Sequence, residues 1–215
     1  MGFDKLVHSR PDFYARKLDF IAACKKLVYK LLFLEKHIGH QRAAIDRRNR
    51  WILETYLAGK KVLEVGCGRG SFLQSLERKH GCRCTGADIS PEMIAFARSH
   101  YPGPDYHVLT GAGLPFADDE FDFVIFCYVL HHVAELDRMV AEATRVGRHV
   151  LIYESCAFER QPLKALSRLY WKTVDGGAWY LSLADWKRRF GLPVLEQVQG
   201  RGLVRYGLLL FQKRT

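Results

Sequence analysis

The spacing of apolar and polar positions changes near residue 60. Between residues 11 and 57, apolar side chains recur at roughly helical spacing with basic residues between them, which predicts two helices separated near Gly39. The second helix is expected at about residues 41–57. Beyond residue 60, short apolar runs alternate with amphipathic stretches. We therefore predict an N-terminal helical extension, residues 1–60, followed by a separate domain, residues 61–215.

The apolar runs of this domain have the length of strands. They are KVLEV, CRCTGAD, DYHVLT, FDFVIFCYVL and RHVLIYES, and helix-like segments separate most of them. FDFVIFCYVL is apolar almost throughout, as is typical of a strand buried on both faces. Ser90 followed by Pro91 marks the start of a helix. Alternation of strands and helices predicts a parallel sheet covered on both faces.

The last third of the chain has a different pattern. Residues of about 157–191 form an insertion rich in aromatic and basic side chains, with helical stretches ended by Gly176 and Gly191. Ser182 is a candidate cap for the second of these helices. The segment PVLEQVQGRGLVRYGLLLFQKR then predicts two strands and a turn near residues 200–202, which would make the last strand antiparallel.

Three glycines follow the first predicted strand directly. Gly66, Gly68 and Gly70 occupy alternate positions, and Glu64 precedes them. Glycine lets the backbone approach a ligand closely, and the N–H groups at the start of the next helix favour an anion. A dinucleotide fingerprint would need glycine where Ser71 stands, and a phosphate loop would need Gly-Lys-Ser/Thr. The turn fits neither of these motifs.

Four stretches between residues 61 and 155 resemble the class I, Rossmann-like S-adenosylmethionine (SAM) methyltransferases. They are VLEVGCGRG, GADISPEMIAFAR, LPFADDEFDFVIFCYVLHHV and EATRVGRHVLIYE, in the order expected for that family. The nearest branch in character contains small-molecule and ubiquinone/menaquinone methyltransferases. The resemblance implies an α/β fold with a seven-stranded, mostly parallel sheet, helices on both faces, an antiparallel last strand and an N-terminal helical lid. It also implies SAM as cofactor and methyl transfer as the reaction.

The resemblance assigns roles at the ends of the strands. The glycine turn would lie against the methionine part of SAM, and Glu64 would orient the turn or meet the cofactor's ammonium group. Asp88, 20 residues after Gly68, would accept hydrogen bonds from the ribose hydroxyls, and Ile89 and Met93 would sandwich the adenine. The implied cofactor contacts are Glu64, Gly66, Cys67, Gly68, Gly70, Asp88, Ile89, Met93, Ala112, Gly113, Leu114 and Cys127.

Thr110 departs from the family pattern. The family commonly has an Asp there, four residues before the "LPF" element, and that Asp binds the adenine amino group. Here the backbone at Ala112 or Gly113, or apolar contact with Leu114, would hold the adenine instead.

The fourth predicted strand ends at candidate catalytic residues. Ligands bind beyond the carboxyl ends of strands in an open parallel sheet, and Tyr128, His131 and His132 fall there. Methyl transfer requires alignment and sometimes removal of a proton, to which the pKa of histidine is suited. His131 is the first candidate for a general base, and His132 is the second. Alternatively, the pair only packs on the cofactor or caps the next helix. Two adjacent histidines lack a third ligand at convincing spacing, so we predict no metal site.

The aromatic and basic insertion indicates an acceptor pocket. Its rings could form the walls around an apolar acceptor and its cations could meet an anionic group, although each residue taken singly also suits ordinary packing or a solvated surface. Tyr14 could close over SAM. The candidate acceptor contacts are Tyr14, Tyr153, Tyr170, Trp171, Trp179, Tyr180 and Arg188.

The net charge of +10 is unevenly distributed. Residues 1–60 hold 13 basic and 6 acidic side chains, residues 61–155 hold 9 and 13, and residues 156–215 hold 11 and 4. Basic flanks attract anionic partners. They leave two alternatives to a small acceptor: an RNA methyltransferase, although no RNA-binding module is recognisable, and peripheral membrane contact through the basic helix near Lys17–Lys36. A third alternative is a partner subunit that binds SAM without catalysis.

Six scattered cysteines favour reduced structural thiols. The N-terminal stretch lacks the apolar core of a signal peptide, and the apolar stretch after it is interrupted by lysines. We therefore expect a cytoplasmic protein.

Overall fold

The computed structural model describes residues 49, 51–111, 113–200 and 205–213. The chain divides into two compact units, residues 1–44 and 45–215. The predicted lid with Tyr14, and the basic helix near Lys17–Lys36, lie outside the described residues. The predicted boundary at residue 60 stays a prediction. The C-terminal end of the second predicted helix lies within the described residues. It is a π-helical turn, η1 (Leu53–Leu57).

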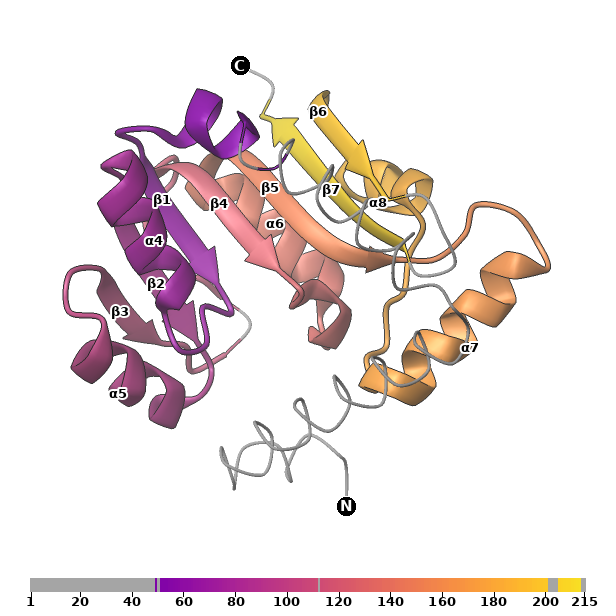
Figure 1. Cartoon of the computed structure of the whole chain (residues 1–215), viewed down its shortest axis with the longest axis horizontal. Helices are drawn as coiled ribbons and strands as arrows, with labels where there is room; N and C mark the ends of the chain where they lie inside the picture. Colours follow the sequence, from indigo (N-terminus) through magenta and orange to yellow (C-terminus); the bar gives the residue numbers. More distant parts are fainter. Residues whose placement is uncertain (1–48, 50, 112, 201–204, 214–215) are drawn as a thin grey trace, which may run out of the picture. The chain divides into compact units, whose positions relative to one another are not determined.

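One seven-stranded sheet organises the second unit (Figure 1). Its order is β3-β2-β1-β4-β5-β7-β6. The first five strands pair in parallel, and β7 runs antiparallel to both of its neighbours. This arrangement confirms the predicted fold class. The strands are β1 (Lys61–Val65), β2 (Arg83–Asp88), β3 (Asp105–Val108), β4 (Phe121–Cys127), β5 (Gly147–Cys156), β6 (Val194–Gln199) and β7 (Arg205–Gln212).

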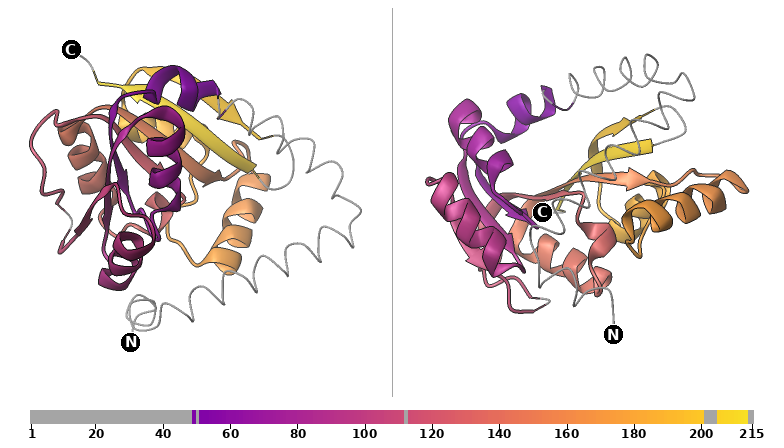
Figure 2. Two further views of the ribbon diagram at one scale, coloured as in Figure 1. Left: turned by 60° about the vertical axis from the view of Figure 1, so that its left-hand side comes forward. Right: turned by 60° about the horizontal axis from the view of Figure 1, so that its bottom comes forward.

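Helices cover both faces of the sheet (Figures 1 and 2). Along β5, Val150 and Ile152 pack in a cluster with α6 (Leu136–Val146) and α8 (Leu183–Phe190). Leu151 points the opposite way, into a cluster with α4 (Ser71–His80) and α5 (Pro91–His100). Successive side chains of a strand point to opposite faces, so a run of apolar residues fills two cores at once.

Local signals set the ends of the helices as the sequence predicts. The Ser90 hydroxyl accepts a hydrogen bond from the N–H of Met93 at 3.2 Å and caps α5. Ser182 caps α8 in a capping box with Asp185. Helix α7 (Leu163–Asp175) ends at left-handed Gly176. The predicted insertion therefore consists of α7, α8 and their connections, between β5 and β6.

The chain reverses its direction of winding at β1. This strand pairs with β2 on one side and with β4 on the other, so the carboxyl ends of β1 and β4 are neighbours. Such a switch point is where ligands bind in open α/β sheets. The glycine turn leaves β1 at this point, and the two histidines follow β4.

No helix in the described part of the chain combines the length and the apolar character needed to cross a bilayer.

Candidate cofactor and acceptor site

The glycine turn is closely packed on two sides and open on one. Gly66, Gly68 and Gly70 all have positive φ, at 75°, 52° and 79°. An added Cβ at Gly66 would overlap the side chain of Val129, and one at Gly70 would overlap Tyr106. At Gly68 the added Cβ would meet nothing within 4 Å. The open side of the turn therefore offers bare backbone to a ligand.

Asp88 holds this turn in place. Its Oδ2 accepts a hydrogen bond from the N–H of Gly68 at 2.8 Å, and its Oδ1 accepts one from the N–H of Ser90 at 2.9 Å. A carboxylate has about four lone-pair sites, so both oxygens can still accept further hydrogen bonds. The acid at the end of β2 is thus held in position with acceptor capacity left for a pair of hydroxyls.

Glu64 is a buried acid beside the turn. It is 3% exposed, and its Oε2 has no hydrogen-bond partner among the described residues. Burial, and then the negative charge of Asp88, hold the pKa of Glu64 well above its usual range. An unpartnered buried carboxyl group is costly, and a cationic ligand group would compensate it.

The predicted adenine contacts lie in different environments. Ile89 is 56% exposed directly after β2, so its apolar side chain is accessible. Leu114, in contrast, is buried in the core, and its N–H donates to Glu142 Oε2 at 2.8 Å. Its side chain and amide are therefore engaged within the protein, and the contact with adenine stays a prediction. Gly113 is half-buried, and Ala112 lies outside the described residues.

Met93, Cys67 and Cys127, three further predicted cofactor contacts, come from three elements. Met93 is half-buried in α5, Cys67 is buried within the glycine turn, and Cys127 is half-buried at the end of β4. Burial is the largest cause that raises the pKa of both thiols. Neither cysteine is therefore a reactive thiolate, and both act as small apolar groups.

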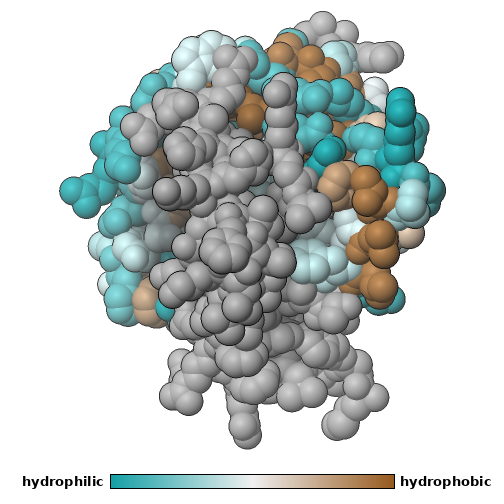
Figure 3. Space-filling view, turned by 45° about the vertical axis from the view of Figure 1, so that its right-hand side comes forward, coloured by the Kyte–Doolittle hydropathy of each residue, from teal (hydrophilic) through white to brown (hydrophobic). Residues whose placement is uncertain are grey.

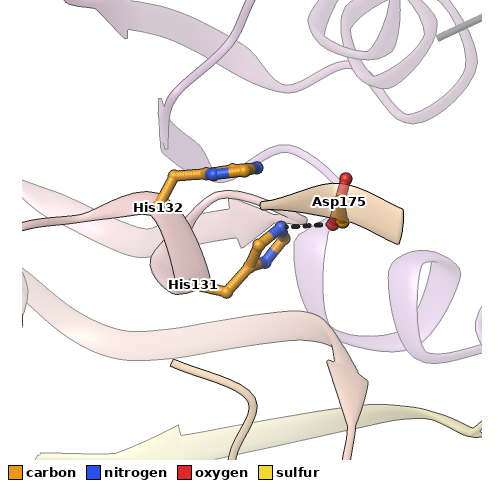
Figure 4. Close-up of side chains that lie close together, drawn as sticks. All are labelled: His131, His132 and Asp175. Atoms are coloured by element: carbon orange, nitrogen blue, oxygen red, sulfur yellow. Dashed lines mark ion pairs between the residues drawn. The ribbon is translucent and has the colours of Figure 1, made fainter. Parts of the chain in front are cut away.

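His131 lies between two carboxylates. It belongs to the short 3-10 helix η2 (Leu130–His132), and its ring is 1% exposed. Its Nδ1 lies 2.5 Å from Glu154 Oε2, and its Nε2 lies 2.9 Å from Asp175 Oδ2, as Figure 4 shows for Asp175. Burial lowers the pKa of His131, but the hydrogen bonds to Asp175 and Glu154 outweigh it and raise the pKa to about 9. Both ring nitrogens are thus hydrogen-bonded to carboxylates, and the role of His131 as a general base stays a prediction.

Four aromatic rings meet near the carboxyl end of β4, beside Tyr153 of β5. Tyr128 follows β4 with φ of 54°, which is uncommon for a residue other than glycine. Its ring lies 4.8 Å from that of Tyr153 and 5.7 Å from that of Tyr206, between centroids. Trp171 of α7 lies 5.7 Å from Tyr206. We call Tyr128, Tyr153, Tyr206 and Trp171 the aromatic cluster.

Tyr206 is the member that the sequence analysis missed. It stands opposite Ser155 in the β5–β7 register and so reaches the edge where Tyr153 lies. The sequence signal for Tyr206 is its place near the start of the last predicted strand. This place indicates proximity to Tyr153 only when the β5–β7 register is known.

The other predicted acceptor residues lie in tighter packing. Tyr180 is buried, with its ring 6.0 Å from that of Trp171, and its hydroxyl accepts from the N–H of Gly177. Trp179 donates to the carbonyl of Val133 at 2.9 Å. Tyr170 is partly exposed and contacts the ring of Trp171 from the edge. Arg188 forms an ion pair with Asp185 in α8 rather than joining the aromatic cluster.

Comparison with known proteins identifies the family. A model described as a methyltransferase domain matches residues 63–150. Phosphatidylethanolamine N-methyltransferase of Cereibacter sphaeroides is 31% identical over 179 residues, which cover 78% of this chain and 87% of that protein. The chain belongs to the class I SAM-dependent methyltransferases.

Two further likenesses agree with this membership. Demethylmenaquinone methyltransferase of Chlorobaculum parvum is 32% identical over 117 residues, or 53% of this chain. That match spans 48% of the relative's own length. The solved structure of geranyl diphosphate methyltransferase in complex with SAM has a TM-score of 0.65 at 16% identity and covers 78% of this chain and 85% of that one. This last likeness concerns the fold.

The described residues of this methyltransferase fit SAM, its cofactor. The unpartnered oxygen of Glu64 suits an ammonium group, the open side of Gly68 suits close approach, and Asp88 has acceptor capacity for ribose hydroxyls. The fit rests on the chemistry and the packing of these groups in this chain.

Proposed function

We propose that this methyltransferase methylates a small acceptor of lipid-like or anionic character. The observation that carries the proposal is the aromatic cluster, to which β5, β7, α7 and the segment after β4 each contribute one ring. Tyrosine and tryptophan provide a large apolar surface with a polar edge, as is typical of small-molecule pockets. The cluster adjoins Cys127, so it borders the proposed cofactor side of the sheet.

The chain's own residues would act mainly by binding and alignment. SAM, when bound, supplies an activated methyl group on its sulfonium. Asp88 and the glycine turn hold the cofactor, Glu64 balances a positive charge, and the aromatic cluster excludes water and orients the acceptor. Burial raises the pKa of Tyr128 above its usual range, so this hydroxyl stays protonated at neutral pH. With His131 engaged on both nitrogens, the acceptor's proton is expected to pass to solvent once the methylated product leaves the water-excluding site.

Helix α7 supports a lipid-like acceptor. Leu163, Leu166 and Leu169 recur every third residue and are each about half exposed or more, at 48%, 58% and 64%. The space-filling view in Figure 3 brings the α7 side forward and shows apolar side chains on the surface there. The same helix carries Trp171 of the aromatic cluster, so an acyl chain lying along α7 would lead towards the proposed acceptor site.

The first acceptor to test is phosphatidylethanolamine, because the relative with that activity aligns along most of its length. Purified protein would be incubated with SAM labelled in the methyl group and with vesicles of this lipid, and the label in extracted lipid would be counted. Demethylmenaquinone and RNA would be run in parallel, and Asp88→Ala would serve as the inactive control. Label in a lipid fraction supports the proposal.

Two results would contradict it. Label in RNA alone would favour the RNA methyltransferase alternative. Binding of SAM with no transfer to any acceptor would favour a non-catalytic partner subunit.

A further inference from the structure

We propose that His131, His132 and Asp175 form a binding site for a divalent cation of the zinc type. Each residue offers one donor atom, and these atoms all lie within 4.8 Å of one another. Figure 4 shows the His131 ring directed at the Asp175 carboxylate, with the His132 ring extending from the same short helix. Two imidazole nitrogens and one carboxylate oxygen are a donor set that suits zinc and similar cations.

The distances need little change to accept a metal. Ligands about 2.0–2.1 Å from a tetrahedral zinc lie about 3.3 Å apart. His131 Nε2 and Asp175 Oδ2 are already 2.9 Å apart. His132 is the exposed member, and its side chain can change rotamer at the surface to complete the site.

Glu154 orients the His131 ring for metal binding. Its Oε2 lies 2.5 Å from Nδ1 of the histidine, while its Oε1 accepts hydrogen bonds from the N–H groups of Val129 and Leu130 at 2.9 and 2.7 Å. A fixed carboxylate behind a histidine ligand sets the ring orientation and directs the other nitrogen to the metal. Here that other nitrogen, Nε2, faces Asp175. The cation would take the place of the hydrogen that joins these two residues.

The site would connect two distant segments. His131 and His132 follow β4, whereas Asp175 is the last residue of α7. A bound cation would therefore fasten the end of α7, the helix that carries Trp171, to the segment after β4. Three protein ligands leave a fourth position for water or a heteroatom of the acceptor. The sequence analysis predicted no metal site because the third donor lies 44 residues beyond His131.

The test titrates the metal-stripped 215-residue protein with Zn²⁺ and with Co²⁺. Nitrogen and oxygen ligands give cobalt a visible d–d absorption without the thiolate charge-transfer band that Cys82 and Cys84 would produce. The variants are His132→Ala, which changes an exposed residue, and Asp175→Asn, which keeps the shape of the side chain. His107→Ala is the matched control. His107 also pairs with an aspartate, Asp105, at 2.9 Å, but among the described residues it belongs to no group of three potential metal ligands.

We expect one equivalent of metal to bind and to raise the Tm in the wild type and in His107→Ala. The two site variants should bind at least about tenfold more weakly and lose the rise in Tm. Circular dichroism of the metal-free variants shows whether they are folded. If Asp175→Asn is unfolded, metal binding by His132→Ala alone tests the proposal. The proposal is overturned if the wild type binds neither ion, if a thiolate band appears, or if folded His132→Ala binds as the wild type does.

Discussion

Asp88 and Gly68, 20 residues apart, are joined by a 2.8 Å hydrogen bond from the glycine N–H to the carboxylate Oδ2. The bond fixes the middle of the glycine turn to the end of the neighbouring strand. The other oxygen of Asp88 accepts from Ser90, at the start of α5. One side chain therefore sets the positions of the turn, the strand end and the helix start that together would surround the cofactor.

Replacing Asp88 with alanine should weaken SAM binding. The change removes an acceptor for the ribose hydroxyls and releases the Gly68 amide, so we expect a loss of about 1–3 kcal/mol, or roughly 5- to 150-fold in Kd. Calorimetric titration with SAM and with S-adenosylhomocysteine measures the loss. Asp105→Ala is the control, because it removes an exposed acid of β3. Equal affinity of Asp88→Ala and the wild type would rule out this role for Asp88.

Alanine substitutions at Gly68 and Gly70 should differ in their effects on stability and on SAM affinity. Gly68→Ala places its Cβ in open space at φ of 52°, so its cost to stability should be about 1–2 kcal/mol, while the added methyl obstructs the cofactor. Gly70→Ala drives a methyl into Tyr106 and should destabilise the fold considerably more. Thermal unfolding and SAM titration of both variants test the difference. Normal SAM affinity in Gly68→Ala would show that the open side of the turn is not the binding side.

Much of the fold could be predicted because its signals are local. Ser90 and Ser182 each cap a helix by accepting a hydrogen bond from a residue three positions later. A continuous apolar run predicts a strand buried on both faces whichever strands pair with it. The glycine turn is likewise contained in a few residues. Such features need no knowledge of register, and the strands and the helix ends follow from them.

The acceptor side depends on contacts between distant segments. Asp175 reaches His131 across 44 residues, and Tyr206 reaches Tyr128 across 78. Both contacts depend on where α7 lies and on the register of β7, and periodicity encodes neither. Tertiary packing also places the side chain of Leu114 in the core, which the motif around this residue does not reveal. The two carboxylates beside His131 likewise come from distant segments, so the sequence does not reveal them.

Tyr206→Ala should affect the acceptor and leave the cofactor alone. The ring contacts Tyr128 and Trp171 in the aromatic cluster, and loss of a central aromatic contact commonly costs more than 1 kcal/mol of binding. We expect the acceptor KM to rise about fivefold or more, with SAM affinity within about twofold of the wild type. Tyr206→Phe keeps the ring and should retain most activity. Tyr101→Ala, at the end of α5, is a control for removal of a tyrosine elsewhere. A weakened SAM affinity with unchanged acceptor KM would place Tyr206 on the cofactor side.

Glu64 should make SAM binding depend on pH. Burial and Asp88 raise the pKa of Glu64 in the free protein, so the carboxyl group holds its proton above the usual value of 4.5. The cofactor's ammonium favours the ionised form, and binding therefore expels this proton. SAM affinity should tighten as pH rises through the raised pKa and should be nearly level with pH in Glu64→Gln. Titrations between about pH 5 and pH 8, a range above the ordinary glutamate pKa, measure both slopes.

The same shift predicts the effect of Glu64→Gln on stability. A raised pKa means that the folded free protein binds more protons than the unfolded chain, so the free energy of unfolding falls as pH rises from the unfolded value through the folded one. Glutamine carries no charge to bury. The variant without SAM should therefore be more stable than the wild type at the upper end of the range, and the difference should shrink towards low pH. Chemical unfolding at several pH values gives this comparison. If Glu64→Gln is less stable than the wild type at every pH, the ionised Glu64 carboxylate has a partner within the protein that stabilises it. Glu64 would then not be available to pair with the ammonium group of SAM.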